Sequence, residues 1–162
     1  MSFLEEVEVV HRDLRAANVL VAADKSVKVA DFGLTKFLSN NPSKRIATST
    51  FPVRWTAPEA MKSNYKPSHK ADVWSFGVLM FEVMTFASQP YAELSQDQIL
   101  PFLQEGRRLP HPRTLGFRCD DNIYQTMCKC WSMQPKDRPD FKELEIGFET
   151  EISQEFGNFY GA

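Results

Sequence analysis

The sequence predicts a mainly α-helical domain with one small β-hairpin near its start. Residues 73–86 are apolar on nearly every face, as in a helix at the centre of a domain, and two later stretches repeat apolar residues at helical spacing. Two short valine-rich runs, 19–21 and 27–29, flank a polar turn, which is typical of a hairpin. With 162 residues, 43% of them hydrophobic and 25% charged, the chain can bury a single core.

The first part of the chain predicts short elements. Residues 1–10 are expected to form the last turns of an apolar helix and then an extended segment. The hairpin follows, and it should hold Asn18 and Asp31 at its two ends. Residues 34–50 are rich in Ser, Thr, Asn, Lys and Arg and show little apolar periodicity, and loops of this length are commonly functional or mobile.

The middle of the chain predicts two helices. A membrane span is the alternative for the central apolar run, but the run is too short and charge interrupts it at Asp72 and Glu82. Ser-Gln-Asp-Gln at residues 95–98 resembles a capping box, which starts a helix that ends near Gly106. Pro-His-Pro at residues 110–112 then stops regular structure.

The last third predicts two more helices. Their apolar stripes are Ile123, Met127 and Trp131, then Phe141, Leu144 and Phe148. Both stripes are more typical of a core face than of a ligand pocket. Because the pattern weakens after residue 150, we expect one domain over residues 1–150 and a fraying tail over residues 151–162.

Composition limits the partners and the compartment. A net charge of −2 gives no electrostatic reason to expect nucleic acid or an anionic membrane as a partner. The three cysteines are odd in number and the start of the chain is acidic, unlike a secretory signal, so we expect a cytoplasmic protein. A metal site at Cys128, Cys130 and His111 is an alternative, but the spacing matches no common zinc pattern, so buried thiols are preferred.

One short loop carries most of the chemistry. Residues 11–18 read His-Arg-Asp-Leu-Arg-Ala-Ala-Asn, which places Asp13 five residues before Asn18. At this spacing one side chain can face a substrate hydroxyl and the other can face Mg²⁺. An Asp-Phe-Gly triplet further on adds a second hard-oxygen ligand, Asp31, ahead of a glycine that allows a sharp turn. With Ala-Pro-Glu at residues 57–59, these segments form the signature set of protein kinases.

On these motifs, the chain resembles the C-terminal lobe of a protein-tyrosine kinase. Arg-Ala-Ala-Asn at residues 15–18 is similar to the catalytic-loop variant of cytoplasmic, Src-type tyrosine kinases, and residues 51–59 are similar to their substrate-docking loop. The resemblance covers residues 1–148, with further matches at 71–78, 127–131 and 137–139. The sequence has no glycine-rich phosphate loop and no strand lysine, so the N-terminal lobe is absent and we expect a product shortened at its N-terminus.

The resemblance implies a role for each residue that would meet substrate or cofactor. Asp13 is expected to be the catalytic base for the tyrosine hydroxyl. Asn18 and Asp31 are expected to bind Mg²⁺ and, through it, ATP. Arg15 is expected to place the substrate phenol and neutralise phosphate charge, with a surface ion pair as the alternative.

The resemblance also implies residues that hold the motifs in place. They are His11, Phe32, Gly33, Trp55, Glu59, Asp72 and Arg138. Asp72 is expected to accept hydrogen bonds from the backbone of residues 11–18. Glu59 and Arg138 are expected to form a buried ion pair, and removing one partner of such a pair costs ~3–5 kcal/mol because the other charge is left stranded.

The activation segment departs from the family pattern. Arg12 is expected to meet a phosphate there, but the segment has no tyrosine, and Src-type spacing puts Ser43 at that position. Ala87 stands where the family has a glycine, and residues 113–121 form a longer loop than their Src-type counterpart. We therefore expect an active arrangement that does not depend on phosphorylation.

Together these inferences predict a cytoplasmic protein-tyrosine kinase that uses ATP and Mg²⁺, acts on protein tyrosines and carries regulatory domains upstream in the full-length protein. The alternative is a catalytically inactive lobe that docks substrates or partners. A purely structural helical scaffold would leave Asp13, Asn18 and Asp31 unexplained together.

Overall fold

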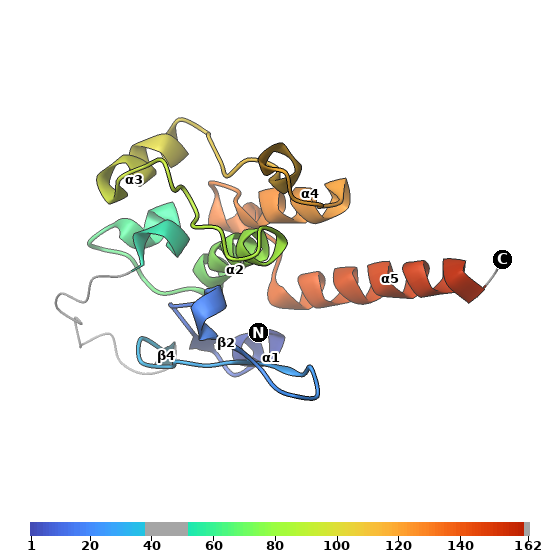
Figure 1. Ribbon diagram of the computed structural model, residues 1–162. Helices are drawn as coiled ribbons and strands as arrows, with labels where there is room; N and C mark the ends of the chain where they lie inside the picture. The colour runs from blue at the N-terminus through green and yellow to red at the C-terminus, as the bar shows by residue number, and fades with distance from the viewer. Residues whose placement is uncertain (38–51, 161–162) are drawn as a thin grey trace.

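The computed structural model describes residues 1–37 and 52–160. Figure 1 shows a helical body around α2, with α1 and the short strands below it and α5 projecting to one side. In chain order the helices and strands are α1 (Ser2–Glu6), β1 (Val9–Val10), β2 (Val19–Val21), β3 (Val27–Val29), β4 (Lys36–Phe37), α2 (His69–Met84), α3 (Gln96–Gln104), α4 (Asp121–Cys130) and α5 (Phe141–Tyr160). Short 3₁₀ turns lie between them at Ala16–Asn18, Val53–Trp55, Pro58–Met61, Pro112–Leu115 and Pro135–Asp137. The predicted fold class, mainly helical with a small hairpin, is confirmed.

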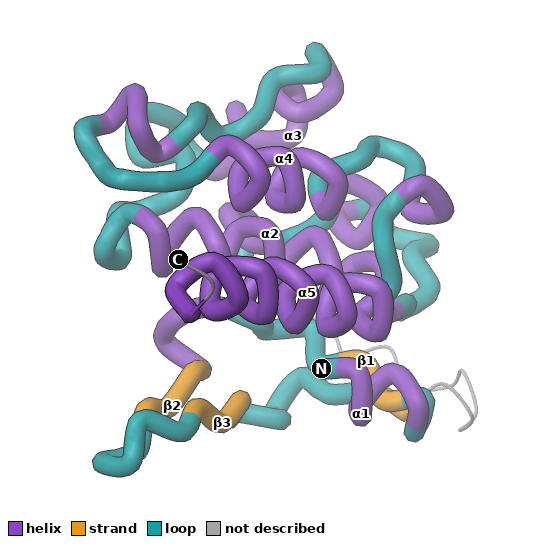
Figure 2. The backbone as a smooth tube through the Cα atoms, turned by 90° about the vertical axis from the view of Figure 1, so that its right-hand side faces the viewer, coloured by secondary structure: helices purple, strands orange, loops and turns teal. Residues whose placement is uncertain are grey.

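The predicted hairpin is the antiparallel pair β2–β3, which lies below the helices in the view of Figure 2. Val19 pairs with Val29 across it. Just beyond this pair, the Ala30 N–H donates to the Asn18 carbonyl oxygen at 2.8 Å. The hairpin therefore brings the end of the 11–18 loop next to the residue that precedes Asp31.

A second antiparallel pair, β1–β4, was not predicted. Val9 lies opposite Phe37 and Val10 opposite Lys36. Each strand has only two residues, which is too short to show the alternation by which strands are recognised in a sequence. The pairing ties the start of the chain to the segment that follows Asp31.

Helix α2 lies at the centre of the core. Its Val73, Trp74 and Val78 side chains are fully buried, as the apolar pattern predicts. The helix packs against α4, and Gly77 allows the close approach, because a Cβ there would lie 2.6 Å from Trp131 Nε1 and 2.8 Å from Cys130 Cβ. Both distances are shorter than real Cβ contacts, so no larger residue fits without moving α4.

The predicted bounds of this central helix, 73–86, are wrong at both ends. The helix begins earlier, at His69, and ends at Met84. Its first turn is polar, so the apolar pattern does not reach it. Phe86 lies beyond the helix with a φ of 50°, and its side chain is 87% exposed. An apolar residue next to a buried helix was therefore misread as part of it.

The predicted start of α3 is confirmed. The Ser95 N–H donates to Gln98 Oε1 at 2.9 Å, as a capping box requires, and the helix ends two residues before Gly106. In α4 the Met127 side chain is buried, as expected for its stripe.

Helix α5 begins at Phe141, and its Phe141 and Leu144 side chains are buried as predicted. The helix continues to Tyr160 without a break at residue 150, so the predicted boundary with the tail does not coincide with a helix end. In the described part of the chain, no helix combines the length and the apolar character needed to cross a membrane.

Candidate active site

The loop at residues 11–18, called the Asp13 loop below, is fixed to α2 by Asp72. The buried Asp72 carboxylate accepts the His11 N–H at 2.7 Å and the Arg12 N–H at 2.9 Å. Burial raises the pKa of the Asp72 carboxyl, while these two hydrogen bonds lower it. Arg12 has a φ of 73°, a strained conformation for this residue type, and the two hydrogen bonds stabilise it. The contacts expected for Asp72 are therefore present.

His11 connects the Asp13 loop to the Asp-Phe-Gly triplet. Its Nδ1 accepts the Asp13 N–H at 3.3 Å, so Nε2 is the protonated nitrogen and donates to the Ala30 carbonyl oxygen at 3.0 Å. The ring also meets the edge of Phe32, with 5.0 Å between ring centroids. Phe32 is otherwise half exposed, so its expected packing role rests on this single ring contact.

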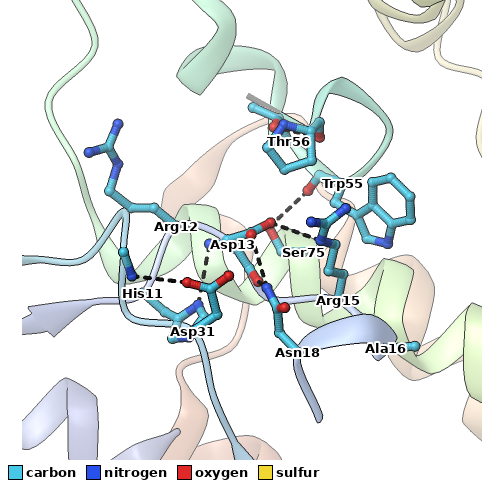
Figure 3. A network of polar contacts seen from close by, with 12 residues as sticks. His11, Arg12, Asp13, Arg15, Ala16, Asn18, Asp31, Trp55, Thr56 and Ser75 are labelled. Carbon is cyan, nitrogen blue, oxygen red and sulfur yellow. Dashed lines mark hydrogen bonds and ion pairs between the residues drawn. The ribbon is translucent and has the colours of Figure 1, made fainter. Parts of the chain in front are cut away.

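Asp13 is held from two sides. Asn18 Nδ2 donates to Asp13 Oδ2 at 2.9 Å and to the Asp13 carbonyl oxygen at 2.8 Å. Arg15 Nε lies 3.1 Å from Asp13 Oδ1. Figure 3 shows both side chains turned toward the Asp13 carboxylate. Within the described residues no donor reaches Oδ1 with hydrogen-bond geometry, and this oxygen is buried beside Arg15 Nε.

Asn18 and Asp31 offer the oxygens for a metal ion. Asn18 uses its Nδ2 on Asp13, which leaves its Oδ1 as a ligand. Asp31 lies in the same cluster in Figure 3; its Oδ1 accepts the Gly33 N–H at 3.2 Å, and its side chain is exposed. Mg²⁺ in nucleotide sites typically takes one or two such protein oxygens and completes its shell with phosphates and water. The residues present fit that ion.

A second set of contacts ties the Asp13 loop to the turn at Val53–Trp55, called the docking turn below after the loop that its sequence resembles. Glu82, from α2, is mostly buried, and its Oε2 accepts the Ala16 N–H and the Trp55 indole N–H, both at 2.9 Å. The Ser75 hydroxyl donates to the Trp55 carbonyl oxygen at 2.8 Å. The Arg15 guanidinium lies over the Trp55 ring, 5.6 Å from its centre. The turn and the loop therefore form one rigid unit on α2.

In the sequence, Glu82 is recognised only as a charge that interrupts an apolar run, and its role at the site was not predicted. An acid inside a helix that is apolar on every face must find partners, since a buried unpaired carboxylate is costly. That signal could have identified Glu82 as an organising residue.

An open groove of about 690 Å³ runs past Asp13. Its walls are the Asp13 loop, the docking turn, the end of α2 and the segment before α3, with lining residues Asp13, Arg15, Leu34, Pro52, Val53, Arg54, Trp55, Glu82, Ala87, Gln89, Pro90 and Gln96. Arg54 supports the far wall, because its guanidinium donates to the carbonyl oxygens of Pro90 at 2.9 Å, Leu94 at 2.8 Å, and Tyr91. The size falls in the range of ligand sites.

Glu59 and Arg138 form the expected ion pair away from this groove. Both carboxylate oxygens accept from the Arg138 guanidinium, at 2.7 and 2.8 Å. The Arg138 side chain is fully buried and lies over the Trp74 ring at 5.0 Å. The pair joins the segment after the docking turn to the base of α5.

Two further predictions concern regulation and metal. Arg12 donates to the Leu34 carbonyl oxygen at 3.2 Å, while Ser43 lies outside the described residues. The three residues of the alternative metal site do not form a ligand cluster: His111 Nε2 instead lies 3.2 Å from Asp121 Oδ1, and the described residues contain no group of three or more His, Cys, Asp or Glu placed to hold a metal ion. Cys130 is buried as preferred, but Cys128 is exposed.

Protein kinases are recognised by a loop that presents an aspartate and an asparagine beside a second aspartate, on the rim of a groove. The chain belongs to that class: residues 1–148 match the protein tyrosine and serine/threonine kinase family. The predicted protein-kinase family is thereby confirmed, while the Src-type subfamily stays a prediction.

Three relatives illustrate the similarity. The chain is 45% identical to tyrosine-protein kinase SPK-1 of Girardia tigrina over 148 residues, which cover 90% of this chain and 30% of that protein. It is 46% identical to tyrosine-protein kinase Srms of Mus musculus over 145 residues, covering 89% and 28%. It is 40% identical to the tyrosine-protein kinase transforming protein Abl of Abelson murine leukemia virus over 150 residues, covering 93% and 19%. The chain thus spans less than a third of the length of each of these relatives.

Proposed function

We propose that this chain is the C-terminal, substrate-binding lobe of a cytoplasmic, Src-type protein-tyrosine kinase, which transfers the γ-phosphoryl group of ATP to tyrosine hydroxyls of proteins. The observation that carries the proposal is the Asp13 carboxylate, which lines the groove with Oδ2 held by Asn18 and Oδ1 without a hydrogen-bond partner among the described residues. The lobe takes residues 1–150, and residues 151–162 form a tail.

Asp13 receives the proton in this mechanism. As the phenol oxygen forms its bond to the γ-phosphorus and the bond from that phosphorus to the leaving ADP oxygen breaks, the phenol proton passes to Asp13 Oδ1. Asn18 keeps the carboxylate from rotating. Because these groups are fixed before substrate arrives, little of the binding energy goes into ordering them.

Arg15 places its positive guanidinium beside the same oxygen, Asp13 Oδ1. Its Nε lies 3.1 Å from Asp13 Oδ1, so its partner is the mostly buried site aspartate rather than a surface acid. Stacking on Trp55 holds the guanidinium at the mouth of the groove, where it can guide the phenol and offset phosphate charge.

Asn18 and Asp31 would bind Mg²⁺ through their free oxygens, and the ion supplies charge neutralisation to the phosphates of ATP. The nucleotide also needs surfaces beyond these two residues. Apolar side chains stand exposed on the hairpin and beside Asp31, namely Leu20, Val21, Val27 and Phe32. A nucleotide-binding lobe elsewhere in the full-length protein would cover them. Upstream regulatory domains are part of the same proposal.

Tyrosine is the proposed acceptor for two reasons. The relatives named above are tyrosine-protein kinases. In addition, the Asp13 loop carries Arg15 two residues after the base, where serine/threonine kinases generally carry lysine. The docking turn resembles the substrate-docking loop of tyrosine kinases.

A docking module that binds substrates without transferring phosphate is the second candidate. The observation in its favour is that residues of this chain line a groove beside Asp13. In this candidate function, peptide binding does not require nucleotide.

The test is to fuse the complete chain to the nucleotide-binding lobe of a tyrosine-kinase relative and to measure phosphate transfer to a tyrosine peptide. Matched peptides with serine or phenylalanine in place of the tyrosine are the controls. Asp13→Asn should lower turnover by roughly 10²–10⁴-fold with ATP affinity nearly unchanged. Asp31→Asn should weaken Mg²⁺-dependent ATP binding as well.

Near-normal turnover in Asp13→Asn would show that Asp13 is not the base. A wild-type fusion that binds the tyrosine peptide and ATP but transfers no phosphate would favour the docking module. Transfer to the serine peptide at an equal rate would contradict the proposed acceptor.

A further inference from the structure

A second hollow, of about 320 Å³, lies between the end of α2 and α3 and is called the Tyr91 cavity below. Most of its wall is apolar, with side chains from α2, from α3 and from the segments on either side of α3: Phe81, Leu94, Phe102, Leu109 and Leu115. The Asp13 loop does not contribute to it. Its volume is at the lower end of the range for ligand sites, so it suits a small molecule.

One wall of the Tyr91 cavity carries a buried hydroxyl without a partner. Tyr91 is 6% exposed, and its ring meets the edge of Phe102 with 5.9 Å between ring centroids. Within residues 1–37 and 52–160, no group forms a hydrogen bond with the Tyr91 hydroxyl. Burial raises the pKa of this hydroxyl, and the nearby charge of Arg108 offsets the rise only in part, so the hydroxyl stays protonated. An acceptor at this position would remove the cost of leaving a buried donor unsatisfied.

Arg108 also lines the cavity, and it brings a positive charge without an acidic partner. The guanidinium groups of Arg108 and Arg138 both lie over the Trp74 ring, 5.2 and 5.0 Å from its centre. Arg138 is paired with Glu59, whereas no acid of the described segments lies within ion-pair distance of Arg108. Burial lowers the pKa of Arg108, which shows that its charge is partly removed from water. The Arg108 charge would therefore be stabilised by an anion.

Part of the Arg108 guanidinium is available to a ligand. Its Nε donates to the Trp131 carbonyl oxygen at 2.9 Å, and its Nη1 donates to the carbonyl oxygens of Leu103 at 3.1 Å and Arg107 at 2.6 Å. In the part of the chain that the structure describes, Nη2 has no hydrogen-bond partner. Glu93 lines the cavity as well, but it is exposed to solvent, where water and salt screen its charge.

We propose that the Tyr91 cavity is a binding site for a small carboxylic acid with an apolar body, of the kind represented by a medium-chain fatty acid. The carboxylate accepts hydrogen bonds from the Tyr91 hydroxyl and from Arg108 Nη2, and the apolar body lies against the apolar wall. A hydrogen bond between guanidinium and carboxylate is stronger than one between neutral groups, and burial of the apolar body removes its surface from water. The site is separate from phosphoryl transfer, since none of these donors belongs to the Asp13 loop.

Calorimetric titration of the complete chain with octanoate tests the site, with 1-octanol as the uncharged match. Octanoate should bind in a saturable manner, one molecule per chain, and about tenfold more tightly than 1-octanol, because only octanoate offers a charged acceptor. Hexanoate, which is two CH₂ groups shorter, should bind roughly tenfold more weakly than octanoate. Arg108→Gln should remove the preference for octanoate over 1-octanol.

Tyr91→Phe is the sharper variant, because it removes only a hydroxyl that has no partner among the described residues. The affinity for octanoate should fall about fivefold, while the melting temperature should stay the same or rise. Tyr65→Phe is the matched control, since the Tyr65 hydroxyl accepts the Ser68 N–H at 2.9 Å and lies outside the cavity lining. The control should lower the melting temperature and leave the affinity for octanoate unchanged.

Three results would overturn the proposal: no saturable binding at millimolar octanoate, equal affinity for octanoate and 1-octanol, or unchanged affinity for octanoate in Tyr91→Phe. Arg108 also holds three carbonyl oxygens, so if Arg108→Gln does not fold, the Tyr91→Phe comparison still decides. A larger fall in melting temperature for Tyr91→Phe than for Tyr65→Phe would show that the Tyr91 hydroxyl already has a partner within the chain, which would also refute the site.

Discussion

Glu59→Gln should be the most destabilising of the conservative changes near the docking turn. The Arg138 guanidinium donates to both Glu59 oxygens at 2.7 and 2.8 Å, to the Lys70 carbonyl oxygen at 2.7 Å and to the Ser132 carbonyl oxygen at 2.8 Å. Among the described residues, Glu59 is the one acid within ion-pair distance of Arg138. Glutamine keeps the size of the side chain, but it strands a fully buried positive charge.

The expected loss of unfolding free energy is ~3–5 kcal/mol, the usual cost of breaking a buried pair on one side. For a chain of this size that corresponds to a melting temperature lower by roughly 6–20 °C. Urea unfolding followed by circular dichroism should show a lower midpoint with an unchanged slope, since the surface exposed on unfolding stays the same.

Two further variants check the cause. Lys142→Gln breaks an exposed pair with Glu145, at 2.8 Å, and should leave the unfolding free energy almost unchanged, because solvent screens exposed pairs. The double variant Glu59→Gln with Arg138→Met removes both charges, so it should lose less than the two single losses added. If Glu59→Gln were no more destabilising than Lys142→Gln, the buried pair would not hold the docking turn and the reasoning would be refuted.

Three other outcomes are expected. Arg54→Lys cannot reproduce three guanidinium hydrogen bonds, so hydrogen exchange in the segment before α3 should become faster. In the fusion, the KM for peptide should rise about threefold or more, while the KM for ATP should not change. Unchanged hydrogen exchange would contradict the supporting role of Arg54. Alkylation of the folded chain at mildly alkaline pH should modify the exposed Cys128 and spare Cys130. Burial raises the pKa of the Cys130 thiol to about 12, so this thiol stays protonated and unreactive. Fast labelling of Cys130 before unfolding would be inconsistent with this burial. Phosphatase treatment of the fusion should leave turnover unchanged, because Arg12 already donates to a backbone carbonyl oxygen. A fall in turnover that is absent in Ser43→Ala, together with phosphoserine found at position 43, would show control by phosphorylation.

Local chemistry in the chain determined much of the site. Asp13 and Asn18 are five residues apart in one loop, so their contact needs little from the rest of the molecule, and the hairpin that brings Asp31 beside them is also local. The positions of the buried helices could be predicted for a similar reason, because apolar spacing records which face of each helix meets the core.

Helix ends and short strands escaped prediction for a different reason. The polar first turn of α2 carries no apolar signal, and the exposed Phe86 carries a misleading one. The β1–β4 pair has two residues on each side, and its backbone hydrogen bonds depend on where two distant segments meet rather than on side-chain type.

Only the tertiary structure decided how the groove is built. Glu82 joins Ala16 and Trp55, which lie on segments far apart in the sequence, and no local pattern specifies such a partnership. No local pattern specifies the hydrogen bonds between Arg54 and the segment before α3, or the ring contact between Phe86 and Phe117. A side chain's own sequence neighbours set its chemistry and its local conformation, but the groups that satisfy a buried charge or share an exposed patch come from whichever segments the packed core brings alongside it.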